Sequence, residues 1–342
     1  MNNEQEFYNL IKQYIKSDYS VSKANEFFNT LHKVGGVIFK DKRFSLKVEN
    51  INKMWGMFKG VNYEFIDEEQ QIKLNSFENY RNDLYRKALQ LINYFHETTH
   101  EKQKDRYIVN NEKAVVDLDD YEKLMDLEIL CNADAKLCNY EQQLIEIDAI
   151  HNSILEYKML LDGNILPRNE QTLSVPLYAC VRYFASINGE KHHVYYPKAF
   201  NMSSENLIGY YKEFYQNLKI NNNNRVKTIQ DIVDESDLSH AMRTELKNID
   251  FEKIQEVIDT KTDEIYSVME NLYGELLNIY KPSDEMLKFF NTSYENFDNK
   301  VKSNNIVRMS ALIFDDIHNK FSDKTTNKIG LTQQIKEGQI EF

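Results

Sequence analysis

Residues 80–100 of this 342-residue chain read YRNDLYRKALQLINYFHETTH. Apolar side chains recur in this stretch at three- and four-residue spacing, which is the period of a helix with one buried face. The side chains that form this face are Leu84, Ala88, Leu91, Ile92 and Phe95. Neither glycine nor proline interrupts the pattern, so the sequence predicts one long, buried helix from about residue 80 to residue 103.

The predicted helix contains the pattern HExxH, written by His96, Glu97 and His100. Two residues four positions apart lie one turn apart on the same helical face, so both imidazoles can bind one zinc ion. Glu97 lies beside that face and can take a proton from a zinc-activated water. The motif therefore predicts a Zn²⁺-dependent hydrolase with His96 and His100 as metal ligands and Glu97 as the catalytic base. The alternative is a pair of core or solvated histidines that bind no metal.

A third protein ligand is expected on a different element, and residues 144–153, LIEIDAIHNS, supply it. On a helix, Glu146 shares a face with small, apolar or aromatic side chains: Ala149, Ile150, Ser153, Tyr157 and Leu160. A buried carboxylate needs a partner such as a metal ion, so Glu146 is the predicted third ligand. Asp148 points to another side of the helix and is expected to orient a ligand through a hydrogen bond. The alternatives for the third ligand are Asp148, Glu141, Glu128 and His151.

The HETTH motif followed by Glu-x-Asp-Ala at residues 146–149 resembles the gluzincin metallopeptidases, especially compact bacterial and phage-type members. Gln103 also fits the H-E-x-x-H-x-x-Q form of the motif. The resemblance covers about residues 60–165 and implies a zincin-like fold, peptidase activity, and a downstream glutamate that completes the zinc site. The long spacing between His100 and Glu146 departs from the thermolysin-like pattern and implies an insertion.

The same resemblance implies how a peptide would bind. In gluzincin-like folds an edge strand before the active helix pairs with the extended substrate, and residues 71–75 are the candidate by position. A tyrosine or histidine usually stabilises the oxyanion in these folds. The candidates after the expected hairpin turn are His192, His193, Tyr195 and Tyr196, and none of them is assigned.

The composition narrows the range of partners. A formal net charge of −12 argues against nucleic acid and anionic membranes, both of which require clustered positive charge. The polar, acidic N-terminus lacks the features of a secretory signal, and the apolar run at residues 175–187 is too short to span a bilayer. Three cysteines, Cys131, Cys138 and Cys180, cannot all pair. We therefore expect a cytoplasmic protein with reduced thiols, the alternative being a secreted effector with an unrecognised signal.

The chain is expected to have an α+β fold in three parts: an N-terminal helical segment at 1–34, a zincin-like metallopeptidase domain at 35–200, and a helical region at 201–342. Helices are expected at 4–33, 80–103, 121–138, 141–163, 251–276 and 303–322, and strands at 37–39, 44–48, 61–66 and 71–75. Gly35-Gly36 should end the first helix, and residues 105–125 should be irregular. Residues 178–187 and 192–196, around Asn188-Gly189, should form a hairpin.

Two functions are compatible with these features. The first is a zinc-dependent peptidase that acts on a peptide or protein substrate, which the presence of Glu97 favours because metal binding alone does not require that acid. The second is a zincin-like interaction protein with a vestigial or structural metal site. In that case the C-terminal helices are the candidate surface for a protein partner.

Overall fold

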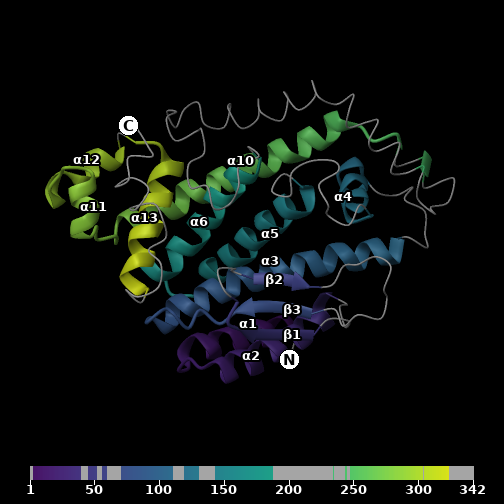
Figure 1. The fold of residues 1–342 in the computed structure, drawn as a ribbon, viewed down its shortest axis with the longest axis horizontal. Helices are drawn as coiled ribbons and strands as arrows, with labels where there is room; N and C mark the ends of the chain where they lie inside the picture. The colour runs from purple at the N-terminus through teal and green to yellow at the C-terminus, as the bar shows by residue number, and fades with distance from the viewer. Residues whose placement is uncertain are drawn as a thin grey trace.

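A computed structural model of the chain describes residues 3–39, 45–51, 56–59, 71–110, 119–130, 143–187, 234, 243–244, 247–302 and 304–322. These residues form a mostly helical structure with one small sheet (Figure 1). The helices before residue 190 are α1 (Asn3–Lys16), α2 (Val21–Phe39), α3 (Asp83–Asn110), α4 (Asp120–Leu130), α5 (Leu144–Asp162) and α6 (Glu170–Ile187). The later ones are α10 (Phe251–Leu277), α11 (Asp284–Phe289), the 3₁₀ turn η5 (Tyr294–Asn296), α12 (Phe297–Lys302) and α13 (Ile306–Phe321).

The sheet consists of β1 (Ser45–Glu49), β2 (Gly56–Lys59) and β3 (Gln71–Asn75), in the order β1-β3-β2. Strand β3 pairs in parallel with β1 and antiparallel with β2. The strands expected near residues 44–48 and 71–75 are thus present. The expectation that residues 71–75 form an edge strand is wrong, because β3 has a hydrogen-bonded neighbour on each side.

Helix α2 covers the outer edge of β1. The Asn25 side chain accepts a hydrogen bond from the backbone N–H of Val48 and donates one to its carbonyl oxygen, at 2.7 and 2.9 Å. Asn29 donates to the carbonyl of Leu46 at 3.0 Å. These side chains satisfy backbone groups that an exposed edge strand would leave open to pairing with another chain. Of the described strands, β2 is therefore the one whose outer edge is hydrogen-bonded to no other described strand or helix.

Helix α3 lies at the centre of the molecule. It contacts β2 and β3 on one side and α5 and α6 on the other, so that it lies between the sheet and the helical layer (Figure 1). Helix α2 also reaches α3, where the rings of Phe28 and Tyr94 lie 5.4 Å apart. The predicted helix is confirmed and extends further than expected, because residues 105–110 continue α3 instead of forming an irregular segment.

Several other sequence predictions are wrong in the region around the sheet. The first predicted helix is two helices, α1 and α2, and residues 35–39 continue α2 through both glycines instead of ending it and starting a strand. Residues 178–187 belong to α6, not to a hairpin. Helix α6 packs against α3, α5, α10 and α13, so most of its faces are apolar and no helical period is visible in its sequence. The expected strands at 61–66 and 192–196, and Asn188-Gly189, lie outside the described residues.

The C-terminal helices pack into the same core as α3. Helix α10 matches the predicted helix at 251–276, and α13 matches the one at 303–322. His318 of α13 makes hydrogen bonds with the hydroxyls of Tyr80 and Tyr85, at 2.7 and 3.1 Å, and thereby fixes the start of α3. Burial lowers the pKa of His318 to about 3, so the imidazole is neutral and one of its nitrogens donates while the other accepts. The three-part division of the chain stays a prediction.

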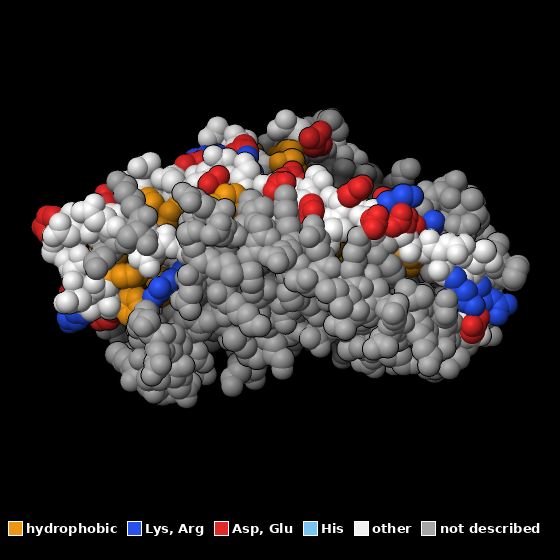
Figure 2. Space-filling view, turned by 90° about the horizontal axis from the view of Figure 1, so that it is seen from above, with side chains coloured by type: hydrophobic (Ala, Val, Ile, Leu, Met, Phe, Trp, Pro, Cys, Tyr) orange, Lys and Arg blue, Asp and Glu red, His pale blue; other side chains and the backbone are white. Residues whose placement is uncertain are grey.

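The described surface matches the acidic composition. Figure 2 shows acidic side chains spread over the described part of the face on which α10 lies. None of the described helices combines the length and the apolar character needed to cross a bilayer. Cys180 of α6 is buried and unpaired, and Cys131 and Cys138 lie outside the described residues.

Candidate metal centre

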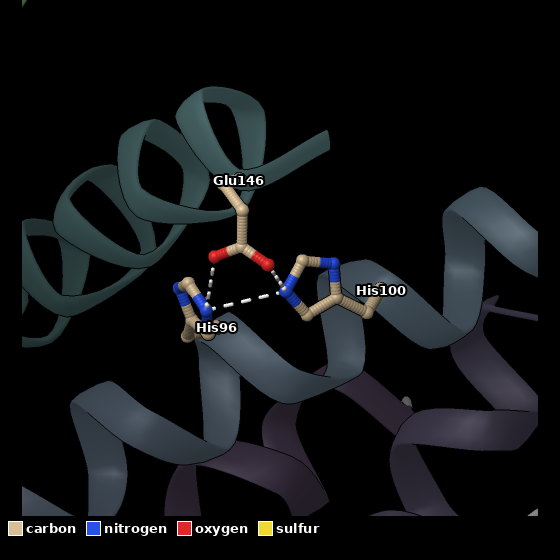
Figure 3. A group of neighbouring side chains, drawn as sticks. All are labelled: His96, His100 and Glu146. Atoms are coloured by element: carbon tan, nitrogen blue, oxygen red, sulfur yellow. Dashed lines mark hydrogen bonds and ion pairs between the residues drawn. The ribbon is translucent and has the colours of Figure 1, made fainter. Parts of the chain in front are cut away.

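Two neighbouring helices bring the predicted metal ligands together. His96 and His100 lie one turn apart on α3, and Glu146 faces them from the first turn of α5 (Figure 3). The Nε2 atoms of the two imidazoles are 3.2 Å apart. One carboxylate oxygen of Glu146, Oε2, lies 3.5 Å from Nε2 of His96, and the other, Oε1, lies 3.3 Å from Nε2 of His100. The sequence reasoning placed Glu146 on this face of its helix, and the structure confirms that position.

These separations fit the donor set of a tetrahedral zinc ion. Ligand atoms at about 2.0–2.1 Å from zinc, the usual Zn–N and Zn–O distances, lie about 3.3–3.4 Å from one another in a tetrahedron. The two Nε2 atoms, 3.2 Å apart, lie close to that separation, and each of them has a different oxygen of Glu146 at 3.5 or 3.3 Å. Two imidazoles and one carboxylate are also a ligand set that leaves a fourth position for water in catalytic zinc sites. The three side chains together could therefore hold a metal ion.

Burial makes this group electrostatically unusual. Glu146 is only 3% exposed and His96 9% exposed. Burial opposes the charge of both imidazoles, and for His96 it prevails and lowers the pKa to about 4. For His100 the Glu146 carboxylate outweighs burial, Glu97 adds to its effect, and the pKa rises to about 9. Burial likewise opposes ionisation of Glu146, but His100 and His96 hold the pKa of this carboxyl well below its usual range. The metal-free group therefore keeps one proton on His100 beside an ionised Glu146.

A second set of hydrogen bonds fixes the orientation of His100. The side-chain oxygen of Gln103 lies 3.0 Å from Nδ1 of His100, and its amide nitrogen donates to Asp148 and to the carbonyl of Ile145, both at 3.0 Å. Because an amide oxygen only accepts, Nδ1 of His100 carries the proton and Nε2 is left to face a metal ion. This contact gives Gln103, noted in the sequence for its place after the motif, a defined role.

Asp148 in turn is held by a helix far away in the sequence. Its carboxylate lies 3.1 Å from Nζ of Lys261 on α10, and it accepts a hydrogen bond from Asn152 at 3.2 Å. Asp148 thus contacts Gln103, the hydrogen-bond partner of His100, and is not one of the three grouped side chains; that it orients a metal ligand stays a prediction. The sequence does not predict the contact between Lys261 and Asp148, because nothing in the sequence of α10 connects the two residues.

The other candidates for the third ligand lie elsewhere. Glu128 accepts a hydrogen bond from the backbone N–H of Ile145 at 3.1 Å and thereby caps the start of α5. His151 faces Glu264 of α10 at 2.9 Å. Glu141 and the four oxyanion candidates, His192, His193, Tyr195 and Tyr196, lie outside the described residues.

Glu97, the predicted base, is 5% exposed and directly follows His96. The hydroxyls of the two threonines that complete the motif, Thr98 and Thr99, turn back to backbone carbonyls of the preceding turn of α3. They therefore complete the buried face of the helix without competing for the metal position.

No protein-family model, no curated protein and no solved structure matches this chain. The gluzincin resemblance thus rests on the motif residues and on the geometry of the His–His–Glu group alone, and membership of that family stays a prediction.

Proposed function

We propose that this protein is a zinc-dependent peptidase whose zinc ion is held by His96, His100 and Glu146. The observation that carries the proposal is the meeting of His96, His100 and Glu146, whose facing nitrogen and oxygen atoms approach one another to 3.2 to 3.5 Å, in a buried group that directly adjoins Glu97. A structural metal site is usually closed by four protein ligands, whereas three ligands with a glutamate next to them in the motif are typical of hydrolytic sites.

Each residue of the site would have its own role in peptide hydrolysis. A zinc ion held at this site lowers the pKa of a water molecule and polarises a carbonyl group. Glu97 would take the proton from the attacking water and pass it to the leaving amine. Gln103 would keep Nδ1 of His100 protonated, so that Nε2 faces the metal. The buried surroundings strengthen each of these electrostatic contacts by excluding solvent.

The sheet suggests where an extended peptide would bind. The proposal of strand addition at residues 71–75 does not hold, since β3 lies inside the sheet. Strand β2 is the better candidate, because α2 covers the outer edge of β1 while β2 packs beside α3 (Figure 1). A peptide added to β2 would gain backbone hydrogen bonds close to the helix that carries the motif.

The test compares the wild type with Glu97→Gln. Both proteins are prepared without chelator, their zinc content is measured, and each is incubated with a diverse peptide library whose new termini are identified by mass spectrometry. The amide is nearly isosteric but cannot accept a proton, so Glu97→Gln should retain about one zinc per chain and lose hydrolysis by on the order of 10²–10⁴-fold.

Glu101→Gln is the matched control. Glu101 is a buried glutamate on the same helix, but it pairs with His32 of α2 at 3.1 Å, and an amide can still hydrogen-bond there. This variant should cleave as the wild type does. Wild-type protein that contains no zinc contradicts the metal site, whereas zinc-loaded wild type that cleaves nothing favours the interaction protein. Cleavage that persists in Glu97→Gln contradicts the assigned base.

A further inference from the structure

A small pocket adjoins the metal centre on the His96 side. Helices α3, α5 and α6 line it, and its polar lining includes Asn93, His96, Ser153 and Arg182. The pocket has room for roughly one water molecule. It is therefore too small for a side chain of a substrate, but it fits a single oxygen atom.

Arg182 of α6 is the cationic side chain of this pocket. Its Nε–H group is buried, and among the described residues it has no hydrogen-bond acceptor and Arg182 forms no ion pair. Buried donors are nearly always paired in folded proteins, so an unpaired one calls for a ligand or a water as its acceptor.

We propose that Arg182 is a substrate-binding residue that donates to the oxygen of the carbonyl group under attack. This inference rests on the proposed peptidase function and adds to it the residue that stabilises the oxyanion. A guanidinium is suited to this role because it stays charged at all relevant pH values and presents several donors in a fixed plane. As negative charge develops on the carbonyl oxygen, its interaction with the guanidinium strengthens, so Arg182 favours the transition state over the bound substrate.

The position of Arg182 also distinguishes it from the ligand residues. It comes from α6, a helix that supplies none of the three metal donors, and it shares the pocket with His96. Loss of the guanidinium should therefore leave the metal in place and weaken only the binding of an oxygen-bearing ligand beside it.

The experiment uses inorganic phosphate, whose tetrahedral oxygens resemble those of the transition state. Zinc-loaded, dialysed protein is titrated with phosphate by calorimetry, and zinc content is measured in every sample. Arg182→Met should bind phosphate roughly 10- to 100-fold more weakly, the usual effect of losing one hydrogen bond to a charged group. Arg182→Gln, a second uncharged variant, should show a loss of the same order and keeps the test valid if the methionine variant does not fold.

Arg168→Met is the matched control. Arg168 also carries one positive charge near α6, but it pairs with Asp162 at 2.7 Å and with Glu275 at the surface. Its loss should change phosphate affinity by less than about twofold, since exposed charges contribute little. Zinc-loaded wild type that binds no phosphate, or uncharged Arg182 variants that bind it as the wild type does, would overturn the inference and leave the peptidase proposal standing. Wild type without zinc would overturn both.

Discussion

The proton that His100 holds in the metal-free protein leads to a quantitative prediction of how zinc affinity depends on pH. With a pKa of about 9, His100 is protonated at pH 7 in the metal-free protein, and zinc can bind Nε2 only after that proton has left. The deprotonation costs about 2 pH units, or on the order of 3 kcal/mol. We therefore expect the apparent zinc affinity at pH 7 to be on the order of 100-fold below its value above pH 9, rising about tenfold per pH unit between them.

The assay is a competition titration against a chromophoric zinc chelator of known pH dependence, repeated from pH 6.5 to 8.5. The comparison variant is Glu146→Gln, which removes the carboxylate that raises the pKa of His100. Without it burial lowers that pKa, so this variant should bind zinc more weakly but with a flatter dependence on pH. His96, with its pKa lowered to about 4, is neutral throughout the range and adds no proton.

Stability of the metal-free protein should change with pH in the opposite direction. A histidine whose pKa is raised on folding stabilises the fold below its unfolded value of about 6.5, and that stabilisation is lost as the pH rises through about 9. The free energy of unfolding without zinc should thus fall over the same range in which zinc affinity rises. A zinc affinity that is constant from pH 6.5 to 8.5 would refute the assignment of the proton to His100.

Two further predictions concern the residues around the metal. Glu146→Ala should weaken zinc binding far more than Asp148→Ala, because the first removes a donor atom and the second only loosens the contact that orients Gln103; equal losses would show that the ligand is misassigned. Lys261→Met should lower zinc affinity roughly 10- to 100-fold by freeing Asp148, whereas Lys253→Met, on an exposed part of the same helix, should leave it unchanged. Zinc titrations of the four variants decide both points. A Lys261→Met variant with wild-type zinc affinity would show that α10 does not influence metal binding.

The link from Lys261 through Asp148 and Gln103 to His100 crosses α10, α5 and α3. Each contact in it is about 3.0 or 3.1 Å long and joins groups that are mostly buried. The orientation of His100 is therefore connected to a helix that lies more than 100 residues after Glu146. The motif by itself does not fix that orientation.

The sequence by itself determined the local features of this protein. The three-to-four-residue period of α3, the one-turn spacing of His96 and His100, and the apolar stripe around Glu146 all depend on helical geometry within one element. These features predicted that His96, His100 and Glu146 could meet, and the structure brings the three side chains together. The end of α5 at Gly163 and the amphipathic period of α10 could be predicted from the sequence for the same reason.

Only the tertiary structure decided which elements meet. Residues 178–187 look like a strand because α6 is buried on nearly every side, which erases the polar face that would reveal a helix. The position of β3 inside the sheet depends on pairing with both β1 and β2, and no single strand encodes that order. Arg182 shares a pocket with His96, and Lys261 is linked to His100 through Asp148 and Gln103, because α6 packs against α3 and α5 and α10 packs against α5. Such contacts between distant segments form when whole helix faces pack against one another. The spacing of residues along one helix does not predict which faces will pack together.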